Sequence, residues 1–273
     1  MKFSIVLLTT MLVFVSLVSA DYIIQKEGWN ALVSLFVLPG NISNAHRSGV
    51  VWVLVSTILE HIGNDKLQEL LCLVMRILSV HASLLSEIHH SGGLEAVLQV
   101  ASEHIDRGQV TQHVLATLVN LVSGEGCSKF FEQNTYSRAI SFTSLALQRY
   151  HRSDQLAHQL KAGTLARLLS AFPSHFKLLA LESRHLFISS VLRRMHESGD
   201  AMLQEEYCSI LRILALNMDN QQLEACPRLY GEERVRLLNY QSNFIKEIQH
   251  LAGLPHLIFL DLYNNRIERI QGL

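Results

Sequence analysis

Residues 216–273 repeat an apolar pattern every 22 residues, and this period constrains the fold more than any other feature of the chain. Apolar residues two positions apart, such as Leu260 and Leu262, predict a short strand, because strand side chains alternate between faces. The polar Asn265 that follows is expected to close a turn by hydrogen bonds to neighbouring backbone. The sequence therefore predicts a stack of short strands joined by turns and return arms. The positions that recur in register are Leu216, Leu238 and Leu260; Met218, Tyr240 and Leu262; Gln221, Asn243 and Asn265; Leu223, Ile245 and Ile267; and Cys226, Ile248 and Ile270.

This pattern is the consensus of the leucine-rich repeat in its short class. With its degenerate first repeat at Cys226-Pro227 and the segment 237–240, it resembles proteins related to the regulatory subunits of protein phosphatase 1. Within that group it is most similar to the leucine-rich-repeat subunit of the tubulin polyglutamylase complex. The resemblance implies an intracellular, non-catalytic protein-binding domain over residues 213–273. Because the pattern stops at Leu273, partway through a unit, we expect the native chain to continue.

Residues 22–212 repeat a longer unit. Sliding the sequence by 43 residues places Leu71 on Val114 and Leu78 on Leu121, and slides of 47 and 46 residues carry the pattern onward. The apolar spacing within these stretches is helical. Periods of this length are typical of armadillo and HEAT repeats, and the similarity covers about residues 50–210. Another helical solenoid or an irregular helical bundle would also fit. The other superimposed pairs are Ile88 and Phe131, Ala96 and Ala139, Val97 and Ile140, Leu118 and Leu165, Leu121 and Leu168, Val122 and Leu169, Phe131 and Leu178, and Ile140 and Phe187.

Two local stretches refine this prediction. Residues 86–100 contain Gly92-Gly93 and resemble the armadillo turn into its third helix, where paired glycines let two helices meet at a sharp angle. Residues 50–59 are apolar nearly all round but too few to span a bilayer, so we expect a fully buried helix of the first repeat. The predicted fold is thus mainly α: an armadillo/HEAT-like helical solenoid followed by the first repeats of an α/β leucine-rich-repeat solenoid.

The first twenty residues form a candidate signal peptide. Lys2 precedes an apolar run, and small residues at Val18-Ser19-Ala20 favour cleavage before Asp21. A buried first helix or a wrongly chosen start would give the same pattern. Asn41 begins an N-glycosylation sequon, which matters only if the chain enters the secretory route.

The charge balance excludes several kinds of partner. Lys and Arg number 23 against 24 Asp and Glu, so no basic footprint for nucleic acid or for a membrane surface is expected. The four cysteines are widely spaced, which argues against a disulfide scaffold and a zinc module. No membrane span is expected once the leader is removed.

No catalytic or metal-binding motif was found, and we expect no enzyme activity and no cofactor. The sequence lacks GxSxG, phosphate-loop and dinucleotide fingerprints. Among the fourteen histidines, adjacent His89 and His90 form the densest cluster, but neighbours on a helix point about 100° apart. We therefore expect histidines in turns or facing solvent.

Binding is expected on the outward side chains of the leucine-rich-repeat strands. Tyr263 is the best single anchor, because exposed aromatic residues are enriched at hot spots. The sequence thus favours a scaffold in the cytoplasm or on the cytoskeleton, whose partner by resemblance is a phosphatase catalytic subunit or a cytoskeletal complex. A secreted or cell-surface recognition protein and an enzyme of undetected class are the alternatives. The candidate protein-binding residues are Asn217, Asp219, Asn239, Gln241, Ser242, Asp261, Tyr263 and Asn264.

Overall fold

A computed structural model of the protein is mainly helical, with a few short strands near its carboxyl end, which confirms the predicted class. The chain divides into two compact units, the first ending at Leu203 and the second beginning at Gln204, inside a helix. The candidate signal peptide, residues 1–20, lies outside the described residues. None of the described helices is both long enough and apolar enough to cross a membrane. The structure describes residues 22–36, 41–124, 127–151, 155–172, 175–176, 178–214, 216–217, 219–229 and 235–271.

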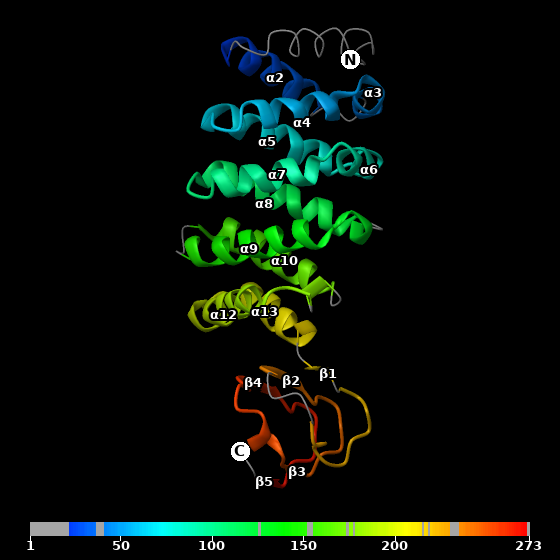
Figure 1. The fold of residues 1–273 in the computed structure, drawn as a ribbon, viewed down its shortest axis with the longest axis vertical. Helices are drawn as coiled ribbons and strands as arrows, with labels where there is room; N and C mark the ends of the chain where they lie inside the picture. Colours follow the sequence, from blue (N-terminus) through cyan, green and yellow to red (C-terminus); the bar gives the residue numbers. More distant parts are fainter. Residues whose placement is uncertain are drawn as a thin grey trace. The chain divides into compact units, whose positions relative to one another are not determined.

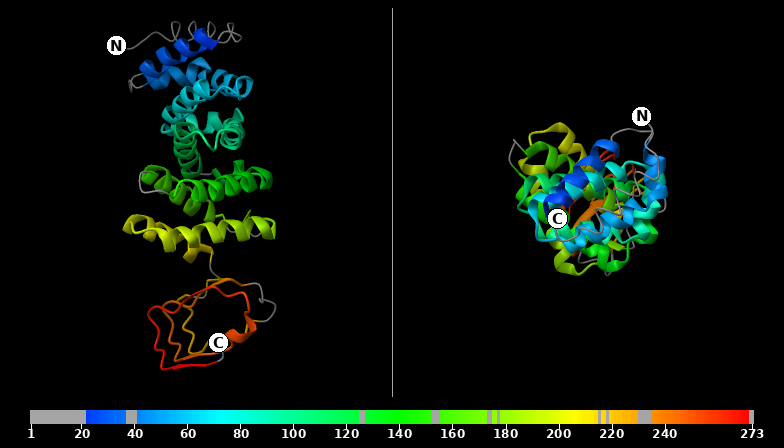
Figure 2. Two further views of the ribbon diagram at one scale, coloured as in Figure 1. Left: turned by 90° about the vertical axis from the view of Figure 1, so that its left-hand side faces the viewer. Right: turned by 90° about the horizontal axis from the view of Figure 1, so that it is seen from above.

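The helices of the first unit are stacked in successive layers (Figures 1 and 2). One series of helices, each packed on the next, consists of α2, α5, α8 and α10. A second series beside it consists of α4, α7, α9 and α12. The helices are α2 (Tyr22–Phe36), α3 (Ile42–Ser48), α4 (Val50–Glu60), α5 (Asp65–Ser79), α6 (Ala82–His90), α7 (Gly93–Glu103), α8 (Gly108–Ser123), the 3-10 helix η2 (Cys127–Phe130), α9 (Gln133–Arg149), α10 (Leu156–Ser170) and α12 (Leu181–Glu197). The division between the units falls within the next helix, α13 (Ala201–Leu214).

The 43-residue period marks core positions. Leu71 and Val114, which the slide superimposes, are both fully buried, as are Leu78 and Leu121. The slide of 47 residues superimposes Leu178 on Phe131, but Phe131 is buried whereas Leu178 is 71% exposed. Leu178 lies in the connection between α10 and α12 and not in either of these helices.

Two glycines with left-handed backbone join short helices to the next helix of their layer. Gly49, between α3 and α4, has φ 73°, and Gly92, between α6 and α7, has φ 78°. A side chain is strained at such φ values, so glycine suits both positions. The paired-glycine turn leads from α6 into α7, and α8 follows through a separate turn after His104.

Helix α4 is only partly as expected. Its Val50, Leu54 and Ile58 are fully buried, but Trp52 is 55% exposed and Leu59 is 43% exposed. The prediction of full burial was wrong because apolar composition does not show which face of a helix its neighbours cover.

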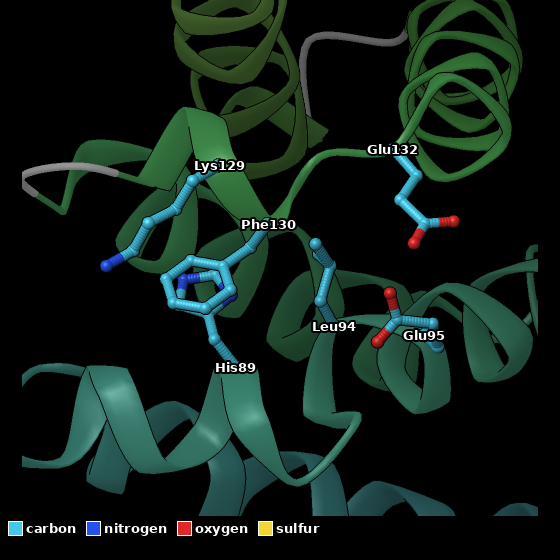
Figure 3. A pocket seen from close by; sticks show the side chains of 6 residues that line it. All are labelled: His89, Leu94, Glu95, Lys129, Phe130 and Glu132. Carbon is cyan, nitrogen blue, oxygen red and sulfur yellow. The ribbon is translucent and has the colours of Figure 1, made fainter.

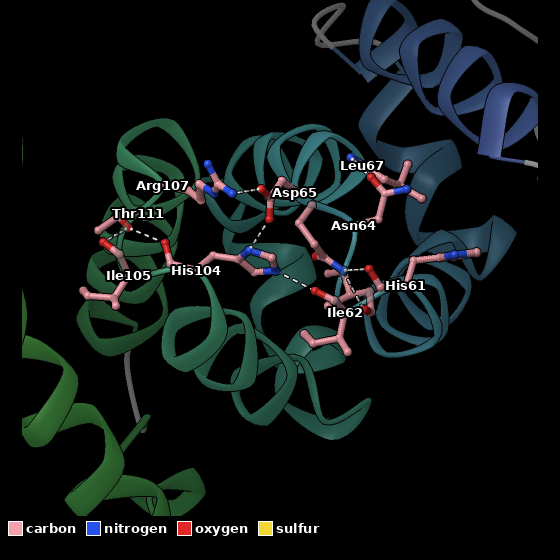
Figure 4. Close-up of polar contacts among 11 residues, drawn as sticks. His61, Ile62, Asn64, Asp65, Leu67, His104, Ile105, Arg107 and Thr111 are labelled. Atoms are coloured by element: carbon pink, nitrogen blue, oxygen red, sulfur yellow. Dashed lines mark hydrogen bonds and ion pairs between the residues drawn. The ribbon is translucent and has the colours of Figure 1, made fainter.

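Polar side chains bind each layer to the next. His104, at the end of α7, is almost fully buried, with Nε2 2.5 Å from Ile62 O and Nδ1 3.0 Å from the Asp65 carboxylate (Figure 4). The guanidinium of Arg107 lies 2.6 Å from the other oxygen of Asp65. The turn after α7 is thus held against the turn after α4.

Similar bonds recur one layer at a time. The hydroxyl of Tyr150, at the end of α9, donates to Ile105 O at 2.6 Å, across 45 residues. Asn120 donates to Ser79 Oγ at 2.9 Å across 41 residues. These spacings are close to the repeat length, because each side chain reaches the equivalent place in the preceding layer.

The second unit contains two parallel sheets of very short strands. In the first sheet the register places Leu216 opposite Leu238 and Leu238 opposite Leu260. In the second, Ile248 is opposite Ile270. All these pairs are 22 residues apart, as the sequence period predicts. The strands are β1 (Leu216–Asn217), β2 (Leu237–Asn239) and β4 (Phe259–Asp261) in the first sheet, and β3 (Glu247–Ile248) and β5 (Arg269–Ile270) in the second.

Candidate protein-binding face of the strands

Asparagine side chains close the turn that follows each of the strands β2 and β4. Asn243 is 3% exposed, and its Oδ1 accepts hydrogen bonds from the backbone N–H groups of Gln221 and Leu223, both at 3.0 Å. Its Nδ2 donates to Tyr240 O at 2.8 Å. Asn265 repeats the arrangement by accepting from a backbone N–H and donating to three carbonyls. Each Asn therefore connects its own turn to the preceding repeat.

Apolar side chains between the two sheets form the core of this unit. Leu238, Tyr240 and Ile245 are fully buried. Burial raises the pKa of the Tyr240 hydroxyl, and it also raises the pKa of the Cys226 thiol against the opposing effect of a hydrogen bond to Gln249. Both groups therefore stay protonated at neutral pH and serve as core residues.

The predicted face is only partly outward. Asn239 is 3% exposed, and its Oδ1 accepts a hydrogen bond from Gln241 N at 2.8 Å. Alternation predicted an exposed side chain, but β2 lies between β1 and β4, and all three of its residues are buried. The side chain of Asn217 lies outside the described residues, and Asp219 is partly exposed.

The remaining predicted residues lie on two neighbouring turns. Tyr263 is 73% exposed, and its N–H donates to the Asp261 carboxylate at 2.9 Å. Asn264 is exposed and donates to Ser242 Oγ at 3.3 Å, while Gln241 is half-buried. We call Gln241, Ser242, Asp261, Tyr263 and Asn264 the strand face. It offers one aromatic ring, one carboxylate and several hydrogen-bonding groups.

Sequence reasoning missed a second aromatic group near these turns. Phe244 is 43% exposed, and the guanidinium of Arg266 lies over its ring at 4.7 Å from the centroid. The two residues are 22 apart, directly after Asn243 and Asn265. The signal in the sequence was a large apolar side chain at a position that is polar in the next repeat.

The histidine prediction was wrong for His89 and His113, which lie within helices α6 and α8 and are each at least nine-tenths buried. His89 stacks on Phe130, with ring centroids 4.3 Å apart. In the described part of the chain, no group of three or more His, Cys, Asp or Glu residues could hold a metal ion.

Asn41, the candidate glycosylation site, is 2% exposed and donates its amide to Leu35 O at 3.0 Å. A glycan on the folded chain would require this side chain to leave that bond.

Comparison with known proteins finds two leucine-rich-repeat relatives. The chain is 52% identical to human leucine-rich repeat-containing protein 49 over 58 residues, which are 21% of this chain and 8% of the relative. It is 55% identical to the mouse protein of the same name over 44 residues, 16% of this chain and 6% of the relative. The chain therefore spans less than a tenth of the length of either relative. The similarity to leucine-rich-repeat proteins covers about a fifth of the chain.

Neither of the other two comparisons gives a match. No protein-family profile matches the chain. No solved structure matches it.

Proposed function

We propose that the protein is a non-catalytic scaffold that binds a partner protein through the strand face. The observation that carries this proposal is the Tyr263 side chain, 73% exposed on a turn whose backbone N–H is bound by the Asp261 carboxylate, in a segment related to leucine-rich-repeat proteins. A tyrosine side chain has only two torsions to order on binding, and tyrosine is enriched among residues that contribute most to binding.

The domain assignment that accompanies this proposal has two parts. Residues 22–212 would be armadillo-like helical repeats, and residues 213–273 would be leucine-rich repeats. The layered helices and the 22-residue strand register support it.

The partner is proposed from the resemblance in the repeats. Similarity to the regulatory subunits of protein phosphatase 1 and to the leucine-rich-repeat subunit of the tubulin polyglutamylase complex suggests two candidates. These are a phosphatase catalytic subunit and a cytoskeletal assembly that contains tubulin-modifying enzymes. Either would place the protein in the cytoplasm or on the cytoskeleton.

A double variant tests the strand face. Asp261→Asn with Tyr263→Ala removes the charge and the ring, but an Asn at 261 can still accept the turn hydrogen bond, as Asn239 does. We expect capture of the partner from cell extract, measured by quantitative mass spectrometry, to fall by about tenfold or more.

The control for this experiment is His256→Ala with Glu268→Ala, which changes two exposed side chains outside the strand face. It should capture the partner as the wild type does. Undiminished capture by the strand-face variant, with its melting temperature preserved, would contradict the proposal.

A further inference from the structure

A groove opens in the first unit where one layer has a shorter element than the layer before it. Helix α6 has 9 residues, whereas η2, which follows α8 as α6 follows α5, is a single turn of 4 residues. Between these elements lies a groove of about 600 Å³, a volume typical of binding sites. Its walls come from the ends of α5 and α8 and from α6 and η2, and they include Ser79, Val80, Leu85, Asn120, Lys129 and Phe130.

Apolar side chains on these walls are open to solvent. Val80 is 67% exposed, and Leu85 and Phe130 are half-buried. Two polar side chains of the groove are already paired with each other, because Asn120 donates to Ser79 Oγ at 2.9 Å. A ligand that covers the groove would therefore gain from the burial of apolar surface.

The charge of the groove is positive. In the described part of the chain, Lys129 is the one Lys, Arg, Asp or Glu side chain that lines it, and its ammonium lies 4.9 Å from the centre of the Phe130 ring. Figure 3 shows Lys129 on the opposite side of Phe130 from the carboxylates of Glu95 and Glu132. Within the described residues, neither carboxylate lines the groove or forms an ion pair with Lys129.

Two further cations converge at helix α8, which lies between α5 and α10 and packs on both (Figure 1). Burial, and then the positive charges of Arg76 on α5 and Lys161 on α10, lower the pKa of His113 on α8. Burial and the charge of Arg76 likewise lower the pKa of Lys161. Since charges affect one another in this way only at short range, the side chains of Arg76 and Lys161 lie near each other and near His113.

These cations adjoin the groove and have no counter-ion. Arg76 precedes Val80 by one helical turn, so both lie on the same side of α5. Arg76 and Lys161 are half-buried, and within the described residues neither forms an ion pair. Like charges that are partly removed from water repel each other, and an anion bound beside them relieves that repulsion.

We infer that the groove and the adjoining Arg76 and Lys161 bind an acidic segment of a partner protein, whose apolar side chain enters the groove while its carboxylates pair with the cations. The charges select an anion, and the exposed Val80 and half-buried Leu85 select a ligand that also carries apolar groups. Inorganic phosphate would leave that apolar wall uncovered, and nucleic acid requires a larger basic surface than three cations. The site belongs to the helical unit and is independent of the strand face.

The test uses a fluorescently labelled peptide with one leucine between two runs of glutamate, and measures its binding to the whole chain by fluorescence anisotropy. At low salt we expect saturable binding with a dissociation constant of about 0.1 mM, reasonable for a short flexible peptide. The same peptide with glutamine in place of glutamate should bind at least about tenfold more weakly. Added salt should weaken binding of the glutamate peptide more than binding of the glutamine peptide.

One pair of variants connects the binding to the cations. Arg76→Gln with Lys161→Gln should weaken binding of the glutamate peptide by about tenfold or more, because it removes two charge-assisted contacts. Lys26→Gln with Arg47→Gln removes two exposed charges elsewhere in the same unit and is the matched control. It should change the affinity by less than about twofold, since those charges are distant and screened. Circular dichroism and melting temperature establish that each variant is folded.

A second pair tests the apolar wall. Val80→Ser should weaken binding by about fivefold, because less apolar surface is buried under the leucine of the peptide. Ile23→Ser, on α2, is its control, since Ile23 is also 67% exposed. Bound peptide should also shift the NMR signal of the Asn120 side-chain amide, which lines the groove, and leave that of Asn243 in the second unit unchanged.

Three results would overturn the inference: equal binding of the glutamate and glutamine peptides, equal binding to Arg76→Gln/Lys161→Gln and its control, or an Asn120 amide signal unmoved by saturating peptide. Single-stranded RNA or inorganic phosphate that binds more tightly than the glutamate peptide would overturn the choice of an acidic protein segment. If Arg76→Gln/Lys161→Gln fails to fold, the ratio of the two peptide affinities and the Asn120 shift on the wild-type chain decide.

Discussion

At the scale of single residues, buried histidines divide into those that hold layers together and those that cost stability on protonation. His104 bonds through both ring nitrogens, one to a carbonyl and one to Asp65. His113, on α8, is 9% exposed and its Nδ1 has no hydrogen-bond partner in the described part of the chain. Burial and the positive charges of Arg76 and Lys161 lower the pKa of His113 from 6.5 to about 4.

This pKa predicts an acid-sensitive fold. Between pH 6.5 and about 4 the unfolded chain binds a proton at His113 that the folded chain does not. Above pH 6.5 His113 is neutral in both states and does not lower the free energy of unfolding. As the pH falls from 6.5 to about 4, the free energy of unfolding decreases by about 1.4 kcal/mol per pH unit. Replacing His113→Gln should remove this slope from urea unfolding curves measured between pH 4.5 and 7.5. His196→Gln, an exposed control, should keep it. A wild-type slope in His113→Gln would refute the assignment.

At the scale of elements, close approach at a glycine fixes the angle between α6 and α7. A Cβ on Gly93 would lie 2.6 Å from Ile88 Cγ2 and 2.7 Å from Ile88 O. The carbonyl belongs to α6 and cannot move away without disturbing that helix. The paired glycines thus act in two ways, Gly92 through its backbone conformation and Gly93 through its small size.

Replacing Gly93→Ala should lower the free energy of unfolding by about 1–3 kcal/mol, because the added methyl group overpacks the helix junction. Gly63→Ala is the matched control, since a Cβ there meets nothing within 4 Å. It should be neutral or slightly stabilising, by less than about 1 kcal/mol. Chemical denaturation of both variants measures the difference, and equal midpoints would show that the junction tolerates a side chain.

Periodicity predicted most elements because it reports which side chains are buried together. The 22-residue pattern located the paired strands and the turn residues Asn243 and Asn265. It could not predict that Asn239 is buried, since β2 lies between β1 and β4 and none of its three residues is exposed. Of the strand face, it located the exposed Tyr263 but missed Phe244.

The burial of His89 was beyond sequence reasoning for a different reason. His89 was expected in a turn or facing solvent, but its ring stacks on Phe130, 41 residues further along the chain. Contacts of this kind depend on how one layer packs on the next, which the apolar periodicity does not determine.

At the scale of the whole molecule, the chain consists of two compact units with separate cores. The asparagine turns belong to the second unit alone, and their hydrogen bonds join one repeat to the next. Damage to one unit should therefore leave the other folded.

Asn243→Ala tests this separation. It leaves the partly buried backbone N–H groups of Gln221 and Leu223 without their acceptor, at a cost of about 1–3 kcal/mol, while Tyr240 O keeps its bond from Asn265. Hydrogen exchange should show lost protection over residues 235–261 and unchanged protection in α5 and α8. Gln221→Ala, at the equivalent but exposed position 22 residues earlier, is the control. Uniform loss of protection along the chain would show that the units unfold together.

The side-chain bonds between layers also restrict how such a chain can change in evolution. His104 reaches Ile62 O, and Tyr150 reaches Ile105 O, so each donor finds its acceptor one layer back. Insertion or deletion of a complete layer preserves every such pair by bringing a new donor and acceptor together. Loss of part of a layer leaves a buried donor without an acceptor, which is costly. We therefore expect the helical part of the protein to gain or lose whole repeats in evolution, and not parts of a repeat.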